Sequence, residues 1–159
     1  MDNLFGLMFI GIILALTVIV PYQFISVGYS FDSNVGQWFE LSDKASTIDR
    51  KLEYLGKFDA AVQKYGLTEG QSTVFFPTKE TSLEENYIVL KTLLQRLNET
   101  SNLSVSSQEY QWALKQITEN EYCWFHIALF KQAFYLKYGS YMFALLPSPN
   151  ENRCARSES

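Results

Sequence analysis

The first part of the chain is a nearly unbroken run of apolar side chains. Its centre is Leu4–Val20, with the sequence LFGLMFIGIILALTVIV, and uncharged residues continue through Pro21 to Phe31. About 20 apolar residues are enough for a helix to cross the hydrocarbon core of a bilayer. The sequence therefore predicts a single transmembrane helix, with residues 1–31 as the anchor and juxtamembrane segment. The predicted membrane-anchor residues are Leu4, Phe9, Ile13, Leu16 and Val20.

A secretory signal peptide is the first alternative for this run. Signal peptides begin with basic residues and end at small residues before the cleavage site. Here the segment before Leu4 holds no Lys or Arg, and the run ends in the bulky residues of 21–24. A proline such as Pro21 is tolerated in a transmembrane helix as a kink. We therefore expect the helix to be retained.

The same run, with Pro21 near its outer end, resembles the N-terminal spine of a type IV pilin. The resemblance implies a filament subunit whose apolar helix packs in the filament core. It is confined to this N-terminal segment, and position 5 is Phe5, where such pilins carry a glutamate near the mature N-terminus. A pilin-like filament subunit is therefore the alternative function.

Beyond Gly36 the apolar positions take on a helical spacing. They recur every three or four residues, which is the pattern of a coiled-coil seam. Ser33 or Asn34 is a suitable first cap and Gly66 a suitable end. The spacing predicts one helix over 34–66, about 46 Å long, which needs partners along its whole length. The seam residues are Trp38, Leu41, Ile48, Leu52 and Leu55.

Two further helices are predicted after a loop over 67–81. The pattern from Ser82 to Glu85 is a capping box, and the helix that it opens places leucines on one face up to Leu97. A second capping box, Ser106 to Glu109, opens a helix that can run to Tyr138. The predicted fold class is mainly α, with the transmembrane helix followed by a small bundle of about three helices, two of them long. The bundle occupies residues 32–146, and residues 147–159 form a flexible polar tail.

The segment 122–146 is apolar on nearly every side. Between Glu121 and Glu151 its only charged residues are Lys131 and Lys137. A surface helix normally has a polar face, so this segment must be covered by a bilayer interface or by protein. Both alternatives remain open at this point. The predicted docking or interfacial residues are Trp124, Phe125, Phe130, Phe134, Tyr135 and Tyr138.

The charge balance is mild. The chain has 13 basic and 17 acidic residues, so it lacks the basic character that nucleic-acid binding requires. The nearest Lys or Arg after the anchor is Lys44, so flanking charges do not set the orientation. We expect the bundle on the non-cytoplasmic side. Cys123 and Cys154 either pair in an oxidising compartment or stay separate.

Candidate chemistry is sparse. Glu119, Cys123 and His126 share one helix face, but a metal site would need further ligands, and the chain has no second histidine. A structural role for His126 is favoured. The sequence has no phosphate-binding glycine loop and no Cys-x-x-Cys motif. We predict neither enzymatic activity nor a cofactor, metal or small-molecule substrate.

The prediction for function is a non-enzymatic, membrane-anchored structural or accessory subunit. It would pack through its helical seams into a larger membrane assembly. The expected partners are the lipid bilayer and other membrane protein subunits or copies of the chain itself.

Overall fold

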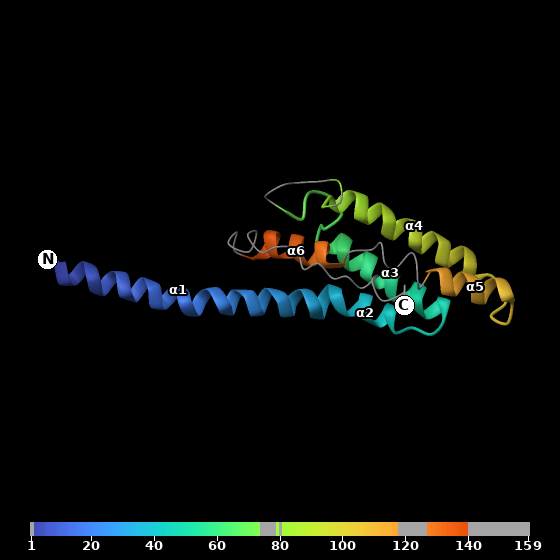
Figure 1. Ribbon diagram of the computed structural model, residues 1–159, viewed down its shortest axis with the longest axis horizontal. Helices are drawn as coiled ribbons and strands as arrows, with labels where there is room; N and C mark the ends of the chain where they lie inside the picture. Colours follow the sequence, from blue (N-terminus) through green and yellow to red (C-terminus); the bar gives the residue numbers. More distant parts are fainter. Residues whose placement is uncertain (1, 74–78, 80, 118–126, 140–159) are drawn as a thin grey trace, which may run out of the picture.

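The protein is a helical bundle from which one long helix projects, as the computed structural model shows (Figure 1). The structure describes residues 2–73, 79, 81–117 and 127–139. The elements are α1 (Asp2–Phe31), the π-helical turn η1 (Asp32–Gly36), α2 (Gln37–Asp43), α3 (Ile48–Lys64), α4 (Leu83–Ser101), α5 (Gln108–Gln116) and α6 (Ile127–Tyr138). The described residues contain no strand, only an isolated bridge between Gln71 and Ser82. The predicted fold class, an apolar N-terminal helix followed by a helical bundle, is confirmed.

The projecting helix does not stop where the bundle begins. α1, η1 and α2 follow one another without a break, so one helix runs from Asp2 to Asp43. We call residues 4–26 of α1 the stem, because this part leaves the bundle. From Val27 onward one face of the same helix packs against the core of the bundle. The predicted boundary at residue 31 therefore falls inside a helix, and the last turn of the predicted anchor belongs to the bundle core.

The π turn η1 keeps one face of this helix directed at the core. Phe31, Val35 and Phe39 are all buried, at intervals of four residues. In an α-helix two intervals of four rotate the side chain by about 80°, so Phe39 would leave the face that Phe31 occupies. A π turn takes up an extra residue and so offsets this drift. The Ser30 carbonyl within this region accepts hydrogen bonds from the side chains of Ser33 and Asn34, at 3.4 and 2.8 Å.

The prediction of one helix over 34–66 is wrong. The chain reverses between Asp43 and Ile48, and α3 runs back alongside α2. Thr47 causes the new start, because its hydroxyl accepts a hydrogen bond from the Arg50 N–H and caps α3. The Ile48 N–H, which has no partner within α3, donates to the Tyr110 hydroxyl at 3.0 Å. The heptad pattern is therefore divided between two antiparallel helices, because the Thr47 cap starts a new helix within it.

The ends of the other helices follow the sequence more closely. Ser82 caps α4 as predicted, by accepting from the Glu85 N–H at 3.4 Å. α5 is capped by Ser107 rather than by Ser106. Gly66 ends α3 as predicted: it has a φ of +61°, and Leu67 N–H bonds to the Val62 carbonyl at 2.9 Å. This is the Schellman arrangement, in which glycine tolerates the left-handed backbone.

The core lies between the inner half of the long helix, α3, α4 and α6. Phe58 of α3 is fully buried and contacts two rings, Phe39 of α2 and Phe130 of α6, at centroid distances of 5.6 and 5.8 Å. The leucines of α4, among them Leu90 and Leu97, complete the interior. Burial of this apolar surface is the main favourable term in folding. The bundle thus has a continuous core of its own.

Lys51 is the exceptional residue of this interior, since it is charged and only 1% exposed. Burial lowers the pKa of Lys51, and the charge of Asp43 acts in the opposite direction with a smaller effect. We predict that Lys51→Met stabilises the bundle by about 1 kcal/mol at pH 7, because removal of the desolvation cost, the larger effect on Lys51, outweighs the loss of its attraction to Asp43. Urea unfolding in mild detergent measures this.

The same substitution has a defined pH dependence. The unfolded chain binds more protons than the folded chain between the lowered pKa of Lys51 and the ordinary value of 10.5. The wild-type protein therefore recovers the lost stability as the pH rises through this window, and the advantage of Lys51→Met should shrink. An advantage that is unchanged up to pH 10.5 would contradict this account.

A second prediction concerns the ion pair that joins α3 to α4. Asp59 is only 13% exposed at its side chain, and its Oδ2 lies 2.7 Å from the Lys91 Nζ and accepts from Gln63. The hydrogen bond to Asp59 is the main reason that the pKa of Lys91 is raised. Asp59→Asn should destabilise the bundle by about 1 kcal/mol, at the upper end for such pairs, because Asp59 is largely shielded from water.

The matched control is the pair of Glu53 and Lys57, which lies on the same helix at 2.6 Å but is exposed at both side chains. Glu53→Gln should leave the urea midpoint unchanged, since water screens an exposed pair. If Asp59→Asn and Glu53→Gln change the urea midpoint equally, the ion pair between α3 and α4 contributes no more stability than an exposed pair.

Candidate functional site

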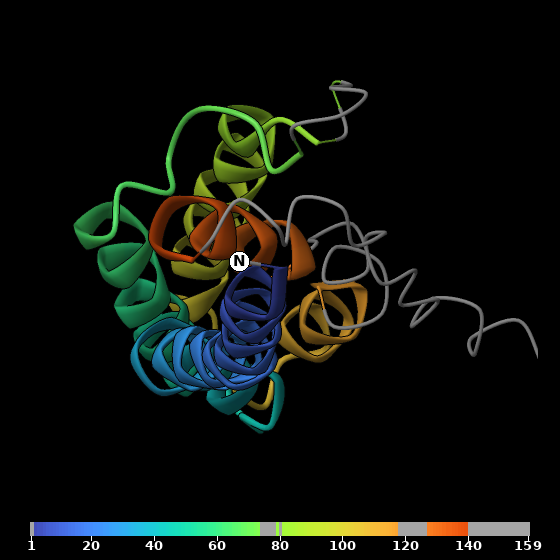
Figure 2. The same cartoon turned by 90° about the vertical axis from the view of Figure 1, so that its left-hand side faces the viewer.

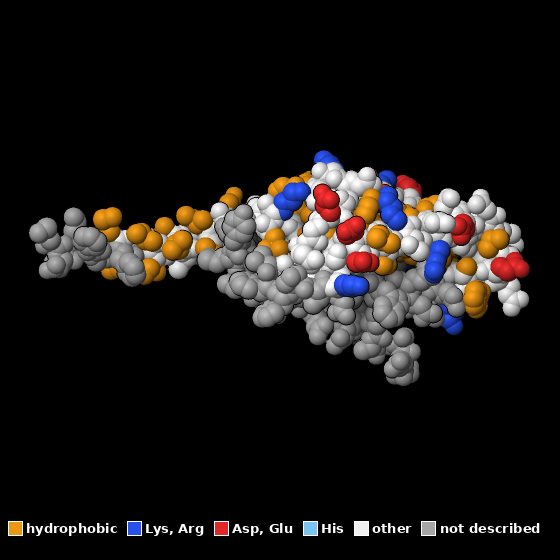
Figure 3. Space-filling view, turned by 90° about the horizontal axis from the view of Figure 1, so that it is seen from above, with side chains coloured by type: hydrophobic (Ala, Val, Ile, Leu, Met, Phe, Trp, Pro, Cys, Tyr) orange, Lys and Arg blue, Asp and Glu red, His pale blue; other side chains and the backbone are white. Residues whose placement is uncertain are grey.

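The stem is the most unusual surface of the molecule. Every stem side chain that the structure describes is exposed, apart from the half-buried Val20. Met8, Leu14 and Val18 are between 62% and 69% exposed, and the apolar residues lie on all sides of the helix. Figure 3 shows hydrophobic side chains along the stem, whereas side chains of both charges dot the visible face of the bundle. An exposed apolar surface of this size marks a site of interaction.

The stem has the dimensions of a membrane-crossing helix. In the described part of the chain, one helix is long and apolar enough to span a membrane, and it lies near the N-terminus. Residues 4–23 alone give about 30 Å of helix, which equals the hydrocarbon thickness of a bilayer. The candidate functional site is therefore the exposed apolar surface of a single helix and not a cleft.

Aromatic contacts fix the base of the stem in the bundle. The ring of Phe31 at the end of α1 meets Phe134 of α6 edge to face, at a centroid distance of 5.4 Å. Phe134 also contacts Tyr65 at 5.3 Å, next to the end of α3. Edge-to-face pairs of this kind add about 1 kcal/mol each to the burial of the rings. Phe134 of α6 thus links the base of the stem to the end of α3, although the three rings come from distant parts of the sequence.

Gly28 allows α1 and α6 to approach closely. This glycine is buried, and a Cβ atom added to it would overlap the hydroxyl of Tyr135. The next atom, Tyr135 Cζ, lies at an ordinary contact distance of 3.4 Å from that position. Burial raises the pKa of Tyr135, as expected for a phenol placed over a helix backbone. Gly28 and Tyr135 are therefore a point of close approach between α1 and α6.

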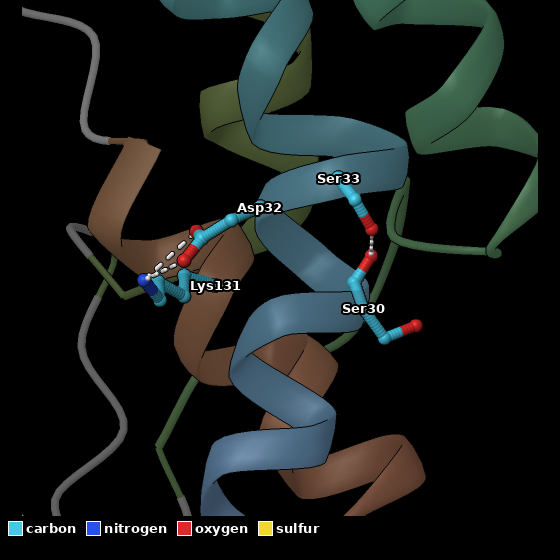
Figure 4. A network of polar contacts seen from close by, with 4 residues as sticks. All are labelled: Ser30, Asp32, Ser33 and Lys131. Carbon is cyan, nitrogen blue, oxygen red and sulfur yellow. Dashed lines mark hydrogen bonds and ion pairs between the residues drawn. The ribbon is translucent and has the colours of Figure 1, made fainter.

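An ion pair between Asp32 and Lys131 lies one helical turn further from the stem than Gly28 (Figure 4). Lys131 Nζ donates to both carboxylate oxygens of Asp32, at 2.9 and 3.0 Å. Both side chains are largely exposed, so the pair adds little to stability. Its value is geometric, because it joins residues 99 positions apart and sets the register of α6 along α1.

The last turn of α6 reaches the end of the bundle from which the stem leaves, which we call the stem end. Lys137 Nζ donates to the carbonyls of Tyr65 and Gly66, both at 3.0 Å. The Tyr138 hydroxyl donates to the Tyr65 carbonyl at 3.1 Å. These donors satisfy carbonyl groups at the C-terminus of α3, which lack partners within their own helix. α6 therefore runs back toward the stem end.

The predicted anchor and seam residues occupy different environments. Leu4, Phe9, Ile13, Leu16 and Val20 all lie in α1, and Ile13 and Leu16 are exposed. In the predicted seam, Ile48 and Leu55 are fully buried, Trp38 and Leu52 are half-buried, and Leu41 is exposed. The structure does not bring the five seam residues onto one stripe, because the first two lie on α2 and the others on α3.

The predicted docking surface needs correction for two residues. Phe130 and Phe134 are 0% and 2% exposed, so the chain covers them with its own α1 and α3. The segment looked uncovered because the sequence did not show that α6 packs against α1. Tyr135 is half-buried and Tyr138 is 48% exposed. Trp124 and Phe125 lie outside the described residues.

The residues of the considered metal site, Glu119, Cys123 and His126, also lie outside the described residues, as does Cys154. Within the described ranges, no three His, Cys, Asp or Glu side chains are grouped in a way that could hold a metal ion.

The residues that join the stem to the bundle, Gly28 and Asp32 among them, were not predicted as contact residues. The spacing of Gly28, Phe31 and Val35 at intervals of three and four continues one helix face past residue 31. It could have shown that this part of the helix packs in the bundle, but not that α6 is its partner.

Comparison with known protein families, with characterised proteins and with solved structures finds no similar protein.

The close approach at Gly28 generates a prediction. Gly28→Ala should destabilise the bundle by about 1 kcal/mol, because the new methyl group forces Tyr135 out of its place. Tyr135→Phe in the same chain should restore most of this loss, since it removes the overlapping hydroxyl. Thermal unfolding of the four proteins of this cycle measures the coupling.

Gly56 in α3 supplies the control, because a Cβ atom added there meets nothing within 4 Å. Gly56→Ala should stabilise the protein by about 0.5 to 1 kcal/mol through helix propensity alone. If Gly28→Ala stabilises the protein to the same degree, α6 does not pack on α1 at this point.

Proposed function

We propose that the chain is a non-enzymatic, membrane-anchored structural or accessory subunit. Its stem crosses the bilayer once, and its bundle, on one side of the membrane, packs into a larger membrane assembly. The observation that carries the proposal is the exposed apolar stem, whose length matches the hydrocarbon thickness. In water such a surface would drive aggregation, so it requires lipid or other apolar helices around it.

The bundle supports the proposal through its closed core. The chain itself buries the aromatic and aliphatic side chains of this core, including those of α6. The bundle can therefore fold whether or not lipid or protein surrounds the stem. The stem is then available as a membrane anchor.

Exposed apolar side chains on the bundle support contact with other subunits. Ile88 on α4 is 53% exposed and Trp112 on α5 is 63% exposed. Tryptophan is enriched among the residues that dominate protein interfaces. These two residues lie on helices that do not contribute to the stem.

A pilin-like filament subunit is the second candidate. The observation that favours it is the single helix from Asp2 to Asp43, whose first part is exposed and whose last part is embedded in the bundle. A helix of this kind can pack beside copies of itself in a filament core. Both candidates use the same apolar surface and differ in what covers it.

The anchor is tested by charged substitutions in the stem. Ile13→Lys combined with Leu16→Lys should release the expressed chain from membranes during an alkaline wash, because each lysine near mid-bilayer costs about 3 kcal/mol. The wild-type chain should remain in the membrane pellet. The control is Ile88→Lys, an equally exposed apolar position on the bundle, which should leave the chain in the pellet.

The assembly is tested by the mass and composition of the particle that mild detergent extracts from the native membrane. An accessory subunit should appear in a large particle together with other polypeptides. Recovery of this chain alone as an open-ended polymer would favour the filament candidate. A monomer would contradict both.

A further inference from the structure

A stripe of exposed residues continues from the stem past the end of its membrane-sized part. Tyr22, Ile25 and Tyr29 are 71%, 69% and 74% exposed. Their spacing of three and four places them on one face of α1. The neighbouring Val27, Gly28 and Phe31 face the bundle instead. The outer face of α1 thus stays apolar and aromatic beside the bundle itself.

The height of this stripe follows from helix geometry. If residues 4–23 fill the hydrocarbon, Ile25 lies about 3 Å above it and Tyr29 about 9 Å above it. The headgroup region on each side of a bilayer is about 5 to 8 Å thick. The stripe therefore extends through the headgroup region, where tyrosine is enriched in membrane proteins.

α6 brings a third tyrosine, Tyr138, to the headgroup region. Asp32 pairs with Lys131, and Gly28 lies against Tyr135, so each step forward along α6 corresponds to one step back along α1. Tyr138, three residues beyond Tyr135, is then level with Ile25. The view from the stem end shows α6 directly beside α1 (Figure 2). Tyr138 is 48% exposed at this end.

We propose that the stem end of the bundle is a lipid-binding surface that lies in the headgroup layer, with Ile25 and Tyr138 as its contact residues. The proposal rests on the proposed membrane anchor and adds the position of the bundle relative to the lipid. The bundle then stands on the membrane surface and is not separated from it by a linker.

The chemistry of this surface favours neutral headgroups. Among the described residues, the exposed Lys64 and Glu69 lie at and just after the end of α3, and the exposed Lys79 and Glu84 flank the start of α4, so these charges balance. Lys137, moreover, is bonded to two carbonyl groups. The contact depends on aromatic and apolar side chains, which settle at the membrane interface without anionic lipid.

The test uses tryptophan fluorescence in the full-length chain, reconstituted in phosphatidylcholine vesicles. Trp38, Trp112 and Trp124 are replaced by Phe, and one tryptophan is then placed at a time, as Ile13→Trp, Ile25→Trp or Tyr138→Trp. A chain that retains Trp112 alone is the control for the bundle surface. Each protein is measured with lipids brominated near the headgroup or near the end of the acyl chain.

The tryptophans at 25 and 138 should lose most of their fluorescence with the shallow bromine and less with the deep one. Ile13→Trp should show the opposite order, and Trp112 should be quenched by neither. Ile25→Trp and Tyr138→Trp lie on different helices, so failure of one variant to fold leaves the other informative.

The failures are distinguishable. If Ile13→Trp is quenched by the deep bromine but positions 25 and 138 behave like Trp112, the anchor stands and the lipid-binding surface does not exist. If the deep bromine quenches position 138 most strongly, the bundle enters the hydrocarbon and the headgroup placement is wrong. If Ile13→Trp is not quenched at all, the membrane anchor itself fails.

Discussion

The structure depends on one continuous helix, which is exposed along its first part and packed into the bundle along its second. From Asp2 to Asp43 the backbone hydrogen bonds continue through α1, η1 and α2, while the side chains change from apolar on every side to apolar on one face. The first part exposes apolar side chains on all sides, and the second supplies Phe31, Val35 and Phe39 to the core of the bundle. Because no loop separates the two parts, the position of the stem determines the position of the bundle.

The sequence predicted those features that depend on local chemistry. The apolar run identified the stem, the Ser82 capping box identified the start of α4, and Gly66 identified the end of α3. These signals act over one or two helical turns, so they do not depend on tertiary contacts. The same kind of signal explains the main error. Thr47 starts a new helix within what looked like a heptad seam, and the seam residues fit equally well on two antiparallel helices.

The contacts that place α6 were beyond sequence analysis, because they join residues far apart in the chain. Nothing in the local pattern shows that Lys131 pairs with Asp32, or that Gly28 lies beneath Tyr135. Because the sequence does not reveal these contacts, the aromatic segment 122–146 was predicted to require a bilayer or another protein to cover it. Once α6 lies against α1 and α3, Phe130 and Phe134 become core residues, and the surface that still needs a partner is the stem with the tyrosines at its base.

The continuity of this helix is best tested by the distance between stem and bundle. Spin labels at Leu16→Cys on the stem and Ile88→Cys on α4, with Cys123 and Cys154 replaced by serine, report this distance by double electron–electron resonance. A continuous helix predicts one narrow distance distribution, which is the same in detergent micelles and in lipid bilayers. A broad distribution, or one that changes between the two environments, would show that the stem moves independently of the bundle and would contradict the account.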